Sequence, residues 1–250
     1  MNTINTNLAY RDEYLYENVI ENEGVQEIAT TTDLARIDKE NKVVKILKNG
    51  VIRIIDIIGS IIGIILLIPI TILIIIMKLV HKDRGPIIYT QNRVGKGGKL
   101  FKLYKFRTMV VGADEILDKY LQENETARME YEINKKLKND PRVTKIGKIL
   151  RKTSLDEFPQ FINVLKGEMS LVGPRPYLPK EVEDMGNVYY TIVQCKPGIT
   201  GLWQVSGRSD VSFDERMELD IIYNKKHSIL QDIIIILKTI GKIIKREGAI

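Results

Sequence analysis

The longest hydrophobic segment of the chain runs from Ile57 to Met77 and contains no charged residue. No polar stripe recurs along it at the helical period of 3.6 residues, which is typical of a helix in lipid. A core helix of a soluble protein is the alternative, but such helices are seldom apolar on every side over this length. The pattern therefore predicts a membrane helix.

Two features bear on whether this helix crosses the bilayer. Pro69 removes a backbone donor and clashes with the preceding turn, so it predicts a kink or a break. Both flanks are basic, with Lys42, Lys45, Lys48 and Arg53 on one side and Lys78, Lys82 and Arg84 on the other. Because Lys and Arg concentrate in cytoplasmic loops, this favours a re-entrant helix with both ends in the cytoplasm. A spanning helix with a proline kink stays open, since a straight helix of this length reaches about 30 Å.

Around this segment the chain divides into three parts. Residues 1–47 are polar and predict a flexible or weakly helical leader. Residues 48–84 hold the membrane helix and its flanks, and residues 85–250 form the main domain, expected in the cytoplasm, whose candidate catalytic residues are described below. Arg53 and Asp56 lie three apart at the start of the apolar segment, where an ion pair would lower the cost of placing both near lipid.

The cytoplasmic part predicts a β-hairpin followed mainly by helices. Two β-prone runs, 87–94 and 100–109, flank a Gly-Lys-rich turn whose spacing is not that of a nucleotide-binding phosphate loop. Residues 114–138 predict one polar helix, and Ser212–Glu215 fits a capping box. Residues 229–244 predict an amphipathic helix, either core-facing or lying in the membrane interface; its basic face favours the second. The expected fold is α+β and mostly helical, with a β-hairpin, a re-entrant membrane helix and amphipathic interfacial helices.

Composition narrows the possible partners. The net charge of +6 suits an anionic membrane surface or a phosphorylated substrate. Nucleic acid is disfavoured, because neither zinc-ligand spacing nor an aromatic RNA-binding signature is present. Cys195 is the only cysteine, which indicates a reducing compartment and no intrachain disulfide. With two distant histidines, any metal would be held mainly by oxygen, as Mg²⁺ is.

Three polar segments carry candidate chemistry. Asp156 and Glu157 form an adjacent acidic pair, although a Thr and a Ser ahead of them also fit an ordinary helix start. Arg175 lies between two prolines, and a stiffened loop presenting a guanidinium suits phosphate recognition. A turn-rich loop over residues 196–208 ends in Arg208. A carboxylate can bind Mg²⁺ or attack phosphorus, while arginines attract phosphates.

Several of these motifs, in this order, closely resemble the bacterial sugar transferase family, the monotopic polyprenyl-phosphate phosphoglycosyl transferases. The resemblance runs from about Lys48 to the C-terminus. The motifs that carry it lie at residues 93–95, 105–109, 151–160, 169–176 and 197–201.

The resemblance implies an activity and roles for residues. Such enzymes transfer a sugar-1-phosphate from a UDP-sugar to undecaprenyl phosphate, release UMP, and so initiate capsule, exopolysaccharide, O-antigen or glycoprotein glycan assembly. Asp156 matches the nucleophile that forms a phosphosugar-aspartyl intermediate. Glu157 matches the partner acid associated with Mg²⁺ and proton handling, and the pair is the expected metal site. The matching basic residues of the active site are Lys105, Arg151, Arg175 and Arg208.

The resemblance also implies a bacterial cytoplasmic-membrane protein with its catalytic domain on the cytoplasmic face. Members have a re-entrant helix broken at a Ser-Pro pair, where this chain has Ile68-Pro69. A direct glycosyltransferase that releases UDP and a non-catalytic membrane-surface scaffold are the alternatives. The identity of the sugar and the formation of a homodimer are left open.

Overall fold

The computed structural model describes residues 31–83, 85–207 and 211–245, with side chains from residue 42 onward. The chain divides into two compact units, Met1–Leu47 and Lys48–Ile250. Helix α2, Thr31–Val80, begins in the first unit and continues into the second. Of the expected polar leader, residues 1–30 lie outside the described residues and residues 31–47 are helical.

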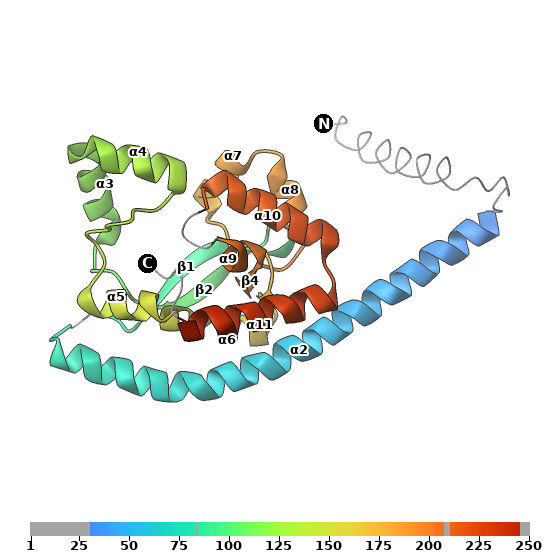
Figure 1. Ribbon diagram of the computed structural model, residues 1–250, viewed down its shortest axis with the longest axis horizontal. Coiled ribbons are helices and arrows are strands. Elements are labelled where there is room, and N and C mark those ends of the chain that lie inside the picture. Colours follow the sequence, from blue (N-terminus) through green and yellow to red (C-terminus); the bar gives the residue numbers. More distant parts are fainter. Residues whose placement is uncertain (1–30, 84, 208–210, 246–250) are drawn as a thin grey trace. The chain divides into compact units, whose positions relative to one another are not determined.

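The second unit is mostly helical, and its described residues form two small sheets (Figure 1). After α2 the elements follow in this order: β1 (Ile88–Val94), η1 (Lys96–Gly98), β2 (Leu100–Phe106), α3 (Ala113–Glu123), α4 (Glu125–Asn134), α5 (Lys145–Lys152), η2 (Leu155–Glu157), α6 (Gln160–Lys166), β3 (Ser170–Val172), η3 (Pro179–Glu181), α7 (Val182–Met185), α8 (Val188–Ile192), β4 (Gly198–Thr200), α9 (Leu202–Ser206), α10 (Phe213–Lys226) and α11 (Ile229–Lys245).

Helix α2 continues through Pro69 without interruption. The expected break at this proline is therefore wrong for the helix itself, which curves as one element in Figure 1. The Thr71 hydroxyl donates to the Leu67 carbonyl at 2.7 Å, a hydrogen bond that connects the residues on either side of Pro69. By length and composition, α2 is long and apolar enough to cross a membrane.

One face of α2 packs against the rest of the second unit. Its contact positions recur in alternating steps of three and four residues, which places them on one face of the helix. They are residues 53, 56, 60, 63, 67, 70, 74 and 77. The other face is apolar and exposed: Ile54, Ile58, Ile61, Ile65, Leu66, Ile68, Ile72, Leu73 and Ile76. The segment is thus apolar on all sides, as its sequence indicates, but one of its faces is covered by protein.

Arg53 and Asp56 do not form the ion pair expected of them. The Arg53 guanidinium donates to two carbonyls at the end of α6. Its Nη1 donates to Val164 at 2.6 Å and its Nη2 to Leu165 at 2.7 Å. The Asp56 carboxylate instead accepts from the Ser170 hydroxyl and the Leu171 N–H, both at 2.8 Å. Each residue therefore fastens α2 to the rest of the second unit, Arg53 at the carboxyl end of α6 and Asp56 at β3.

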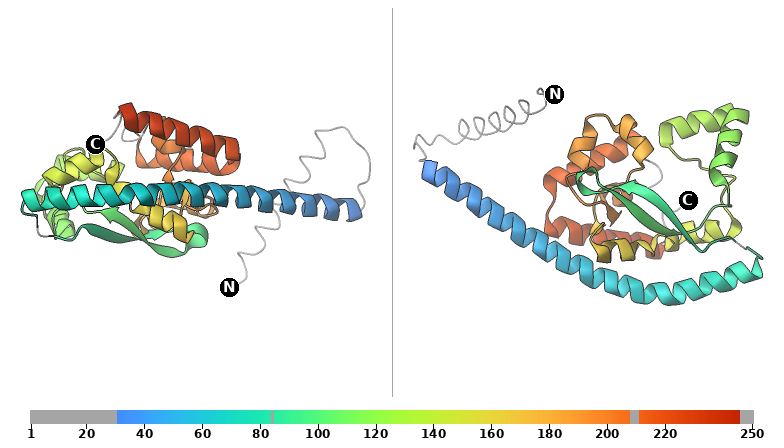
Figure 2. Two further views of the ribbon diagram at one scale, coloured as in Figure 1. Left: turned by 90° about the horizontal axis from the view of Figure 1, so that it is seen from below. Right: turned by 180° about the vertical axis from the view of Figure 1, so that it is seen from behind.

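Three further helices lie beside α2 (Figures 1 and 2). Ile146 and Leu150 of α5 share a hydrophobic cluster with Ile74 of α2. Phe161 of α6 lies against Gly63, where an added Cβ would come within 2.3 Å of the ring. Helix α11 borders α2 across a small recess. The sequence prediction of a helix at the C-terminal end of the chain is confirmed, and α11 has exposed apolar residues along with buried Ile235.

The predicted hairpin is confirmed, with β1 and β2 paired antiparallel from Ile88 opposite Phe106 to Val94 opposite Leu100. The prediction of one helix over 114–138 is wrong. Asn124 separates α3 from α4, and its side chain caps α4 by accepting from the Ala127 N–H at 3.0 Å. The capping box that begins α10 at Ser212 is confirmed.

The second sheet joins β3 and β4 in parallel, with Ser170 opposite Gly198 and Val172 opposite Thr200. The segments after both strands emerge at the same edge, as in other parallel pairs. Gly173 and Gly201 begin these segments so close together that a Cβ on Gly201 would lie 2.3 Å from the Gly173 oxygen. This edge presents Arg175 from the loop after β3 and Trp203 from α9, which begins directly after Gly201.

Candidate active site

Asp156 and Glu157 lie in η2, the short turn that connects α5 to α6. The expected Thr or Ser cap is wrong. Ser154 has a φ of 56° and makes no side-chain cap, while the Thr153 hydroxyl donates back to the carbonyls of Ile149 and Leu150, which closes α5. The acidic pair therefore does not begin an α-helix, and a helix dipole does not account for it.

Asp156 lies beside the apolar surface of α2. Its side chain is buried, and the residues next to it in the turn, Leu155 and Phe158, pack into the same hydrophobic cluster as Leu67 and Ile70 of α2. The turn that carries this carboxylate is thereby packed against α2.

The surroundings of Asp156 shift its pKa upward. Burial raises the pKa of this carboxyl, the charge of Glu157 raises it further, and the cations of Lys105 and Arg151 oppose both. Desolvation with cations nearby is the environment of an activated carboxylate nucleophile, since the anion is poorly solvated yet still available.

Glu157 has a different environment. Its Oε1 accepts from Lys105 Nζ at 2.7 Å. Burial alone would raise the pKa of Glu157, but the charge and hydrogen bond of Lys105, with further contributions from Arg175 and Gln160, lower it below its usual value. Neighbouring carboxyls whose pKa values are pushed apart are suited to separate roles.

Arg151 is held at the end of α5 by its side chain. Its Nε donates to the Thr108 hydroxyl at 3.1 Å, and burial lowers the pKa of the guanidinium despite the nearby charge of Asp156. A guanidinium keeps its charge under such a shift, so Arg151 supplies a fixed cation next to the candidate nucleophile.

Arg175 leaves the β3 edge with donor capacity to spare. Its Nη2 lies 3.9 Å from Glu181 Oε1, and its guanidinium stacks over the Trp203 ring at 5.8 Å. Its charge is felt at Glu157, which places it in the same neighbourhood as the acidic pair. The fourth expected basic residue, Arg208, lies outside the described residues.

The structure brings in Arg93 and Gln160, which the sequence reasoning did not assign to the site. Gln160 contributes to the lowered pKa of Glu157, while Arg93 and Arg175 each have a buried Nε–H without a protein acceptor. Burial lowers the pKa of Arg93 to about 10, and the charge of Arg175 adds to this. A cluster of underused donors and mutually repelling cations favours an anionic ligand. The available signal for Arg93 is its place in the motif at 93–95.

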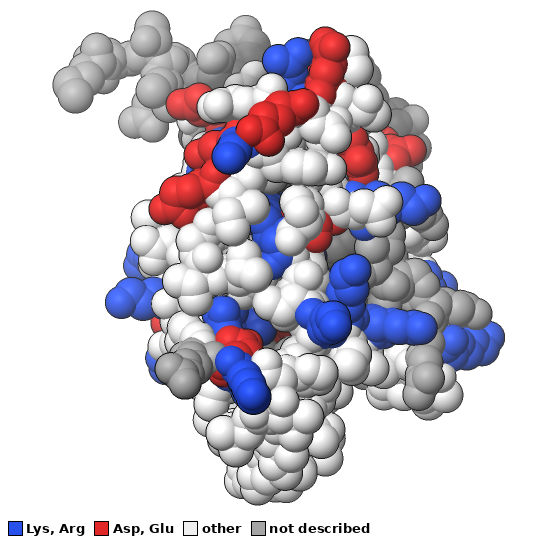
Figure 3. Space-filling model, turned by 90° about the vertical axis from the view of Figure 1, so that its left-hand side faces the viewer, with Lys and Arg blue, Asp and Glu red and all other residues white. Residues whose placement is uncertain are grey.

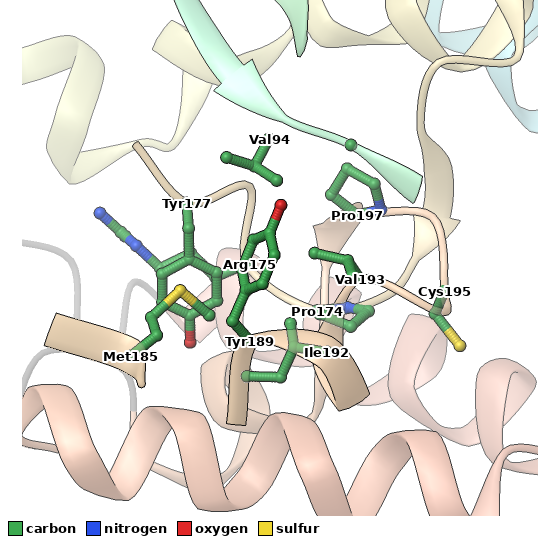
Figure 4. A pocket seen from close by; sticks show the side chains of 11 residues that line it. Val94, Pro174, Arg175, Tyr177, Met185, Tyr189, Ile192, Val193, Cys195 and Pro197 are labelled. Atoms are coloured by element: carbon green, nitrogen blue, oxygen red, sulfur yellow. The ribbon is translucent and has the colours of Figure 1, made fainter. Parts of the chain in front are cut away.

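A narrow recess adjoins Arg175 (Figure 4). It lies between the end of β1, the loop around Arg175 and α8, and its walls are mainly apolar. Tyr177 and Tyr189 line it, and Figure 4 shows their hydroxyls directed to opposite sides of the recess.

The acidic pair fits a magnesium ion shared with a phosphate ligand. Among the described residues, no group of three or more His, Cys, Asp or Glu side chains could hold a metal by itself. Mg²⁺ commonly uses one or two carboxylates and takes its remaining ligands from water and substrate phosphates. Asp156 and Glu157 can supply the carboxylates of such a site but not an all-protein cage.

Charge is unevenly distributed over the second unit (Figure 3). The lower end in this view, where α2 runs, is almost free of charge, and Lys and Arg side chains gather above it. The end of α2 and helix α5 carry the exposed lysines Lys82, Lys145, Lys148 and Lys152. The acidic side chains gather higher up, on the α3–α4 side of the molecule. A basic zone next to an apolar face suits an anionic membrane surface.

Comparison with known proteins gives a consistent result. Residues 47–246 match the family described as bacterial sugar transferase. The chain is 50% identical over 198 residues to the UDP-galactose-lipid carrier transferase of Erwinia amylovora, covering 79% of this chain and 41% of that protein. It is 48% identical over 197 residues to the undecaprenyl-phosphate galactose phosphotransferase of Salmonella typhimurium, with coverage of 79% and 41%.

A shorter relative is covered more fully. The exopolysaccharide production protein ExoY of Rhizobium meliloti is 42% identical over 197 residues, which are 78% of this chain and 85% of that protein. The chain thus spans less than half the length of the first two relatives and most of the third. With a family match over most of its length, and with motifs that meet in one site, the chain belongs to the bacterial sugar transferase family.

Proposed function

We propose that this protein is a phosphoglycosyl transferase that moves a sugar-1-phosphate from a UDP-sugar to undecaprenyl phosphate and releases UMP. The observation that carries the proposal is the environment of Asp156: a buried carboxylate under the charges of Lys105 and Arg151, in a turn whose Leu155 and Phe158 pack in one cluster with α2. A soluble donor and a lipid acceptor can both reach a nucleophile at such a boundary. The names of two relatives, which mention a lipid carrier and undecaprenyl phosphate, support the same substrates.

In the first step, an oxygen of Asp156 attacks the phosphorus that bears the sugar. The bond from this phosphorus to the bridging oxygen breaks, UMP leaves with that oxygen, and a phosphosugar-aspartyl intermediate remains. Arg151 and Arg175 stabilise negative charge on the phosphates, and Lys105 keeps Glu157 ionised in its place.

In the second step, a phosphate oxygen of undecaprenyl phosphate attacks the same phosphorus. The acyl phosphate bond breaks, the Asp156 carboxylate is regenerated, and the sugar is joined to the lipid by a diphosphate. Glu157 would handle protons, or would hold Mg²⁺ together with Asp156. When bound, Mg²⁺ supplies charge neutralisation on the diphosphate.

We also infer that the protein attaches to one leaflet of the cytoplasmic membrane, with the catalytic domain in the cytoplasm. Contacts of α2 with the cytoplasmic fold extend from Arg53 to Met77, which is about 36 Å of helix. A helix spanning the bilayer would carry this fold into the hydrocarbon layer, which is about 30 Å thick. The apolar outer faces of α2 and α11 would instead lie against lipid.

The test is an assay of nucleotide release with purified protein, Mg²⁺, undecaprenyl phosphate and UDP-galactose or UDP-glucose. We expect UMP from the preferred donor, and a donor radiolabelled on the sugar-linked phosphate should label the protein when the acceptor is omitted. Asp156→Asn should lose both signals while staying membrane-bound. Normal UMP release by this variant would contradict the assignment of the nucleophile.

The assay also separates the alternative functions. A direct glycosyltransferase would release UDP, because the bond broken would join the sugar to the diphosphate. A membrane-surface scaffold would bind vesicles containing anionic lipid and release no nucleotide. No observation in the site favours either of these over the phosphoglycosyl transfer.

A further inference from the structure

The loop that presents Arg175 is held by a buried carboxylate from outside the acidic pair. Asp220 of α10 is fully buried. One of its oxygens, Oδ2, accepts from the Arg175 backbone N–H at 3.0 Å and from the Tyr177 hydroxyl at 2.9 Å. The two donors belong to the residues before and after Pro176, so a single oxygen holds the loop on both sides of this proline.

The rest of the loop is braced by other elements. Gly173 donates to the Thr200 carbonyl and Pro174 accepts from the Gly198 N–H, both at 2.9 Å. Arg93 donates to the Pro176 carbonyl, also at 2.9 Å. These contacts fix the backbone before and after Arg175, whereas Asp220 fixes the N–H of Arg175 itself.

Burying the Asp220 carboxylate is energetically unfavourable, so a contribution to folding stability alone does not explain its presence. Its second oxygen, Oδ1, is buried and has no hydrogen-bond partner, which is unfavourable for an acceptor removed from water. Burial raises the pKa of Asp220 to about 7, against the hydrogen bonds and against the charges of Arg175 and Arg216. A buried carboxylate with an unpaired oxygen and a raised pKa is a candidate for a functional role.

Asp220 does not belong to the acidic pair and reaches the reacting groups only through Arg175. The Trp203 ring forms the other side of this arrangement, because Arg175 and Arg216 both stack on it, at 5.8 and 5.6 Å. The main chain of Arg175 is thus held by Asp220, and its guanidinium lies within cation–π distance of Trp203. A planar fork that must meet two phosphate oxygens depends on both being fixed.

We propose that Asp220 is a positioning residue for donor binding, which directs the Arg175 guanidinium toward the diphosphate by holding the backbone of its loop. The inference rests on the proposed function, since it assumes a UDP-sugar donor. It predicts that acceptor oxygens at position 220 set donor affinity more than they set the rate of the chemical steps.

The test compares two substitutions of nearly the same shape. Asp220→Leu removes both acceptors, and we expect the KM for UDP-galactose and the Kd for UDP to rise about tenfold, with kcat changed less than about threefold. Asp220→Asn keeps an oxygen that can accept both hydrogen bonds, so its KM and Kd should stay within about threefold of wild type. An unchanged KM in Asp220→Leu would overturn the inference, as would an Asn variant as impaired as the Leu variant.

A control and a second variant guard against loss of folding. Asp232 is also buried and also accepts from a tyrosine hydroxyl, that of Tyr223 at 2.8 Å; Asp232→Leu should leave the Kd for UDP unchanged. If Asp220→Leu folds poorly, the double variant with Tyr177→Phe leaves only the Arg175 N–H unpaired and should show the same rise in Kd.

The two proposals can fail separately. Wild-type protein that binds UDP but releases no UMP from any UDP-sugar would overturn the proposed function. Wild-type protein that releases UMP, with Asp220→Leu binding UDP as wild type does, would overturn the role of Asp220 alone. Wild-type protein that does not bind UDP would overturn both.

Discussion

The acidic pair combines two carboxyls whose pKa values move in opposite directions. Asp156 is buried, and its pKa is raised although Lys105 and Arg151 oppose the shift. Glu157 has the hydrogen bond from Lys105, and its pKa is lowered. Glu157 is directly paired with Lys105, whereas no hydrogen bond or ion pair from another residue to the Asp156 carboxylate is found among the described residues, so Asp156 is the better nucleophile of the two.

This difference predicts the acid side of the pH profile. Because the pKa of Asp156 is raised, kcat/KM should begin to fall as pH drops at a value above the ordinary range of an aspartic acid, as the nucleophile becomes protonated. Lys105→Met removes a charge that lowers this pKa, so it should move the acid limb to higher pH. An acid limb that does not move in Lys105→Met would contradict the electrostatic role of this lysine.

Replacing Arg175 by lysine should not be conservative. A point charge cannot reproduce the stacking on Trp203 or a two-pronged contact with phosphate oxygens. We expect kcat/KM for the UDP-sugar to fall by about tenfold or more, equivalent to about 1.4 kcal/mol. Arg128→Lys on the exposed side of α4 is the matched control and should behave as wild type. Equal kcat/KM values for the two variants would show that the guanidinium shape is not used.

At the scale of single residues, the sequence indicates most of the described site. Asp156, Glu157, Lys105, Arg151 and Arg175 meet in one region, as their motifs predict. Gln160 ends the motif at 151–160 without being assigned a role there, and Asp220 lies in no motif. Their roles come from tertiary contacts, which residue spacing does not encode.

The docking of α2 depends on close approach at its glycines. Gly63 lies so near Phe161 that a Cβ would come within 2.3 Å of the ring, whereas Gly50 in the same helix has open space around it. Phe161 packs edge-to-face on Phe158, at a centroid distance of 5.4 Å. Displacement of Phe161 would therefore be transmitted to the turn that carries Asp156.

A pair of glycine substitutions in α2 tests this arrangement. Gly63→Ala should destabilise the folded protein by about 1–3 kcal/mol through overpacking and should also slow UMP release. Gly50→Ala should stabilise it by up to about 1 kcal/mol, because alanine favours a helix more than glycine does. Thermal unfolding of the purified protein in detergent measures both changes. Similar unfolding temperatures for the two variants would refute the close contact at Gly63.

The junction of α10 and α11 contains a titratable contact. His227 Nε2 lies 3.0 Å from Asp232 Oδ2. Its hydrogen bonds, first with Asp232 and then with Cys195, raise the pKa of His227 to about 9 from an ordinary value of 6.5. The folded protein therefore binds this proton more tightly than the unfolded chain does. The resulting stability is fully present below the unfolded pKa and is lost as pH rises through about 9.

This linkage predicts a loss of stability between neutral and alkaline pH. The contribution is on the order of 3 kcal/mol at most. His227→Gln should remove most of the difference in unfolding temperature between pH 6 and pH 9.5, while the exposed His81→Gln should keep it. An unchanged pH dependence in His227→Gln would show that another group is responsible.

At the scale of elements, local sequence patterns predicted the hairpin and the start of α10 correctly, whereas the long polar stretch over 114–138 gave a wrong helix boundary. The hairpin around 95–99 and the capping box at Ser212 are confirmed because glycine and capping side chains determine structure locally. The helix over 114–138 is divided because Asn124 can cap a new helix as readily as it can continue an old one. Pro69 is accommodated in a continuous α2, whose packing along one face offsets the missing hydrogen bond.

The charge on the second unit would give it a direction relative to a membrane. In Figure 3 the end where α2 runs is almost free of charge, Lys and Arg lie next to it, and the acidic side chains lie on the α3–α4 side. An anionic leaflet would attract the basic zone and repel the acidic one, which orients the site toward the lipid. Segment hydropathy predicted membrane contact, but the three-dimensional distribution of charge required the folded chain.

The last prediction concerns the topology of α2. Arg53 at one end of its contact face and Met77 at the other bind the same fold, so both ends of the helix should lie on one side of the membrane. In a Cys195→Ser background, we place a single cysteine at the exposed Lys45, before the apolar segment, or at the exposed Lys138, after it. In intact cells neither site should react with a membrane-impermeant thiol reagent, and both should react after permeabilisation. Labelling of the cysteine at position 45 in intact cells, with that at 138 protected, would mean that α2 crosses the bilayer. In that case the contacts from Arg53 to Met77 could not all persist, because the cytoplasmic fold would have to follow the helix into hydrocarbon.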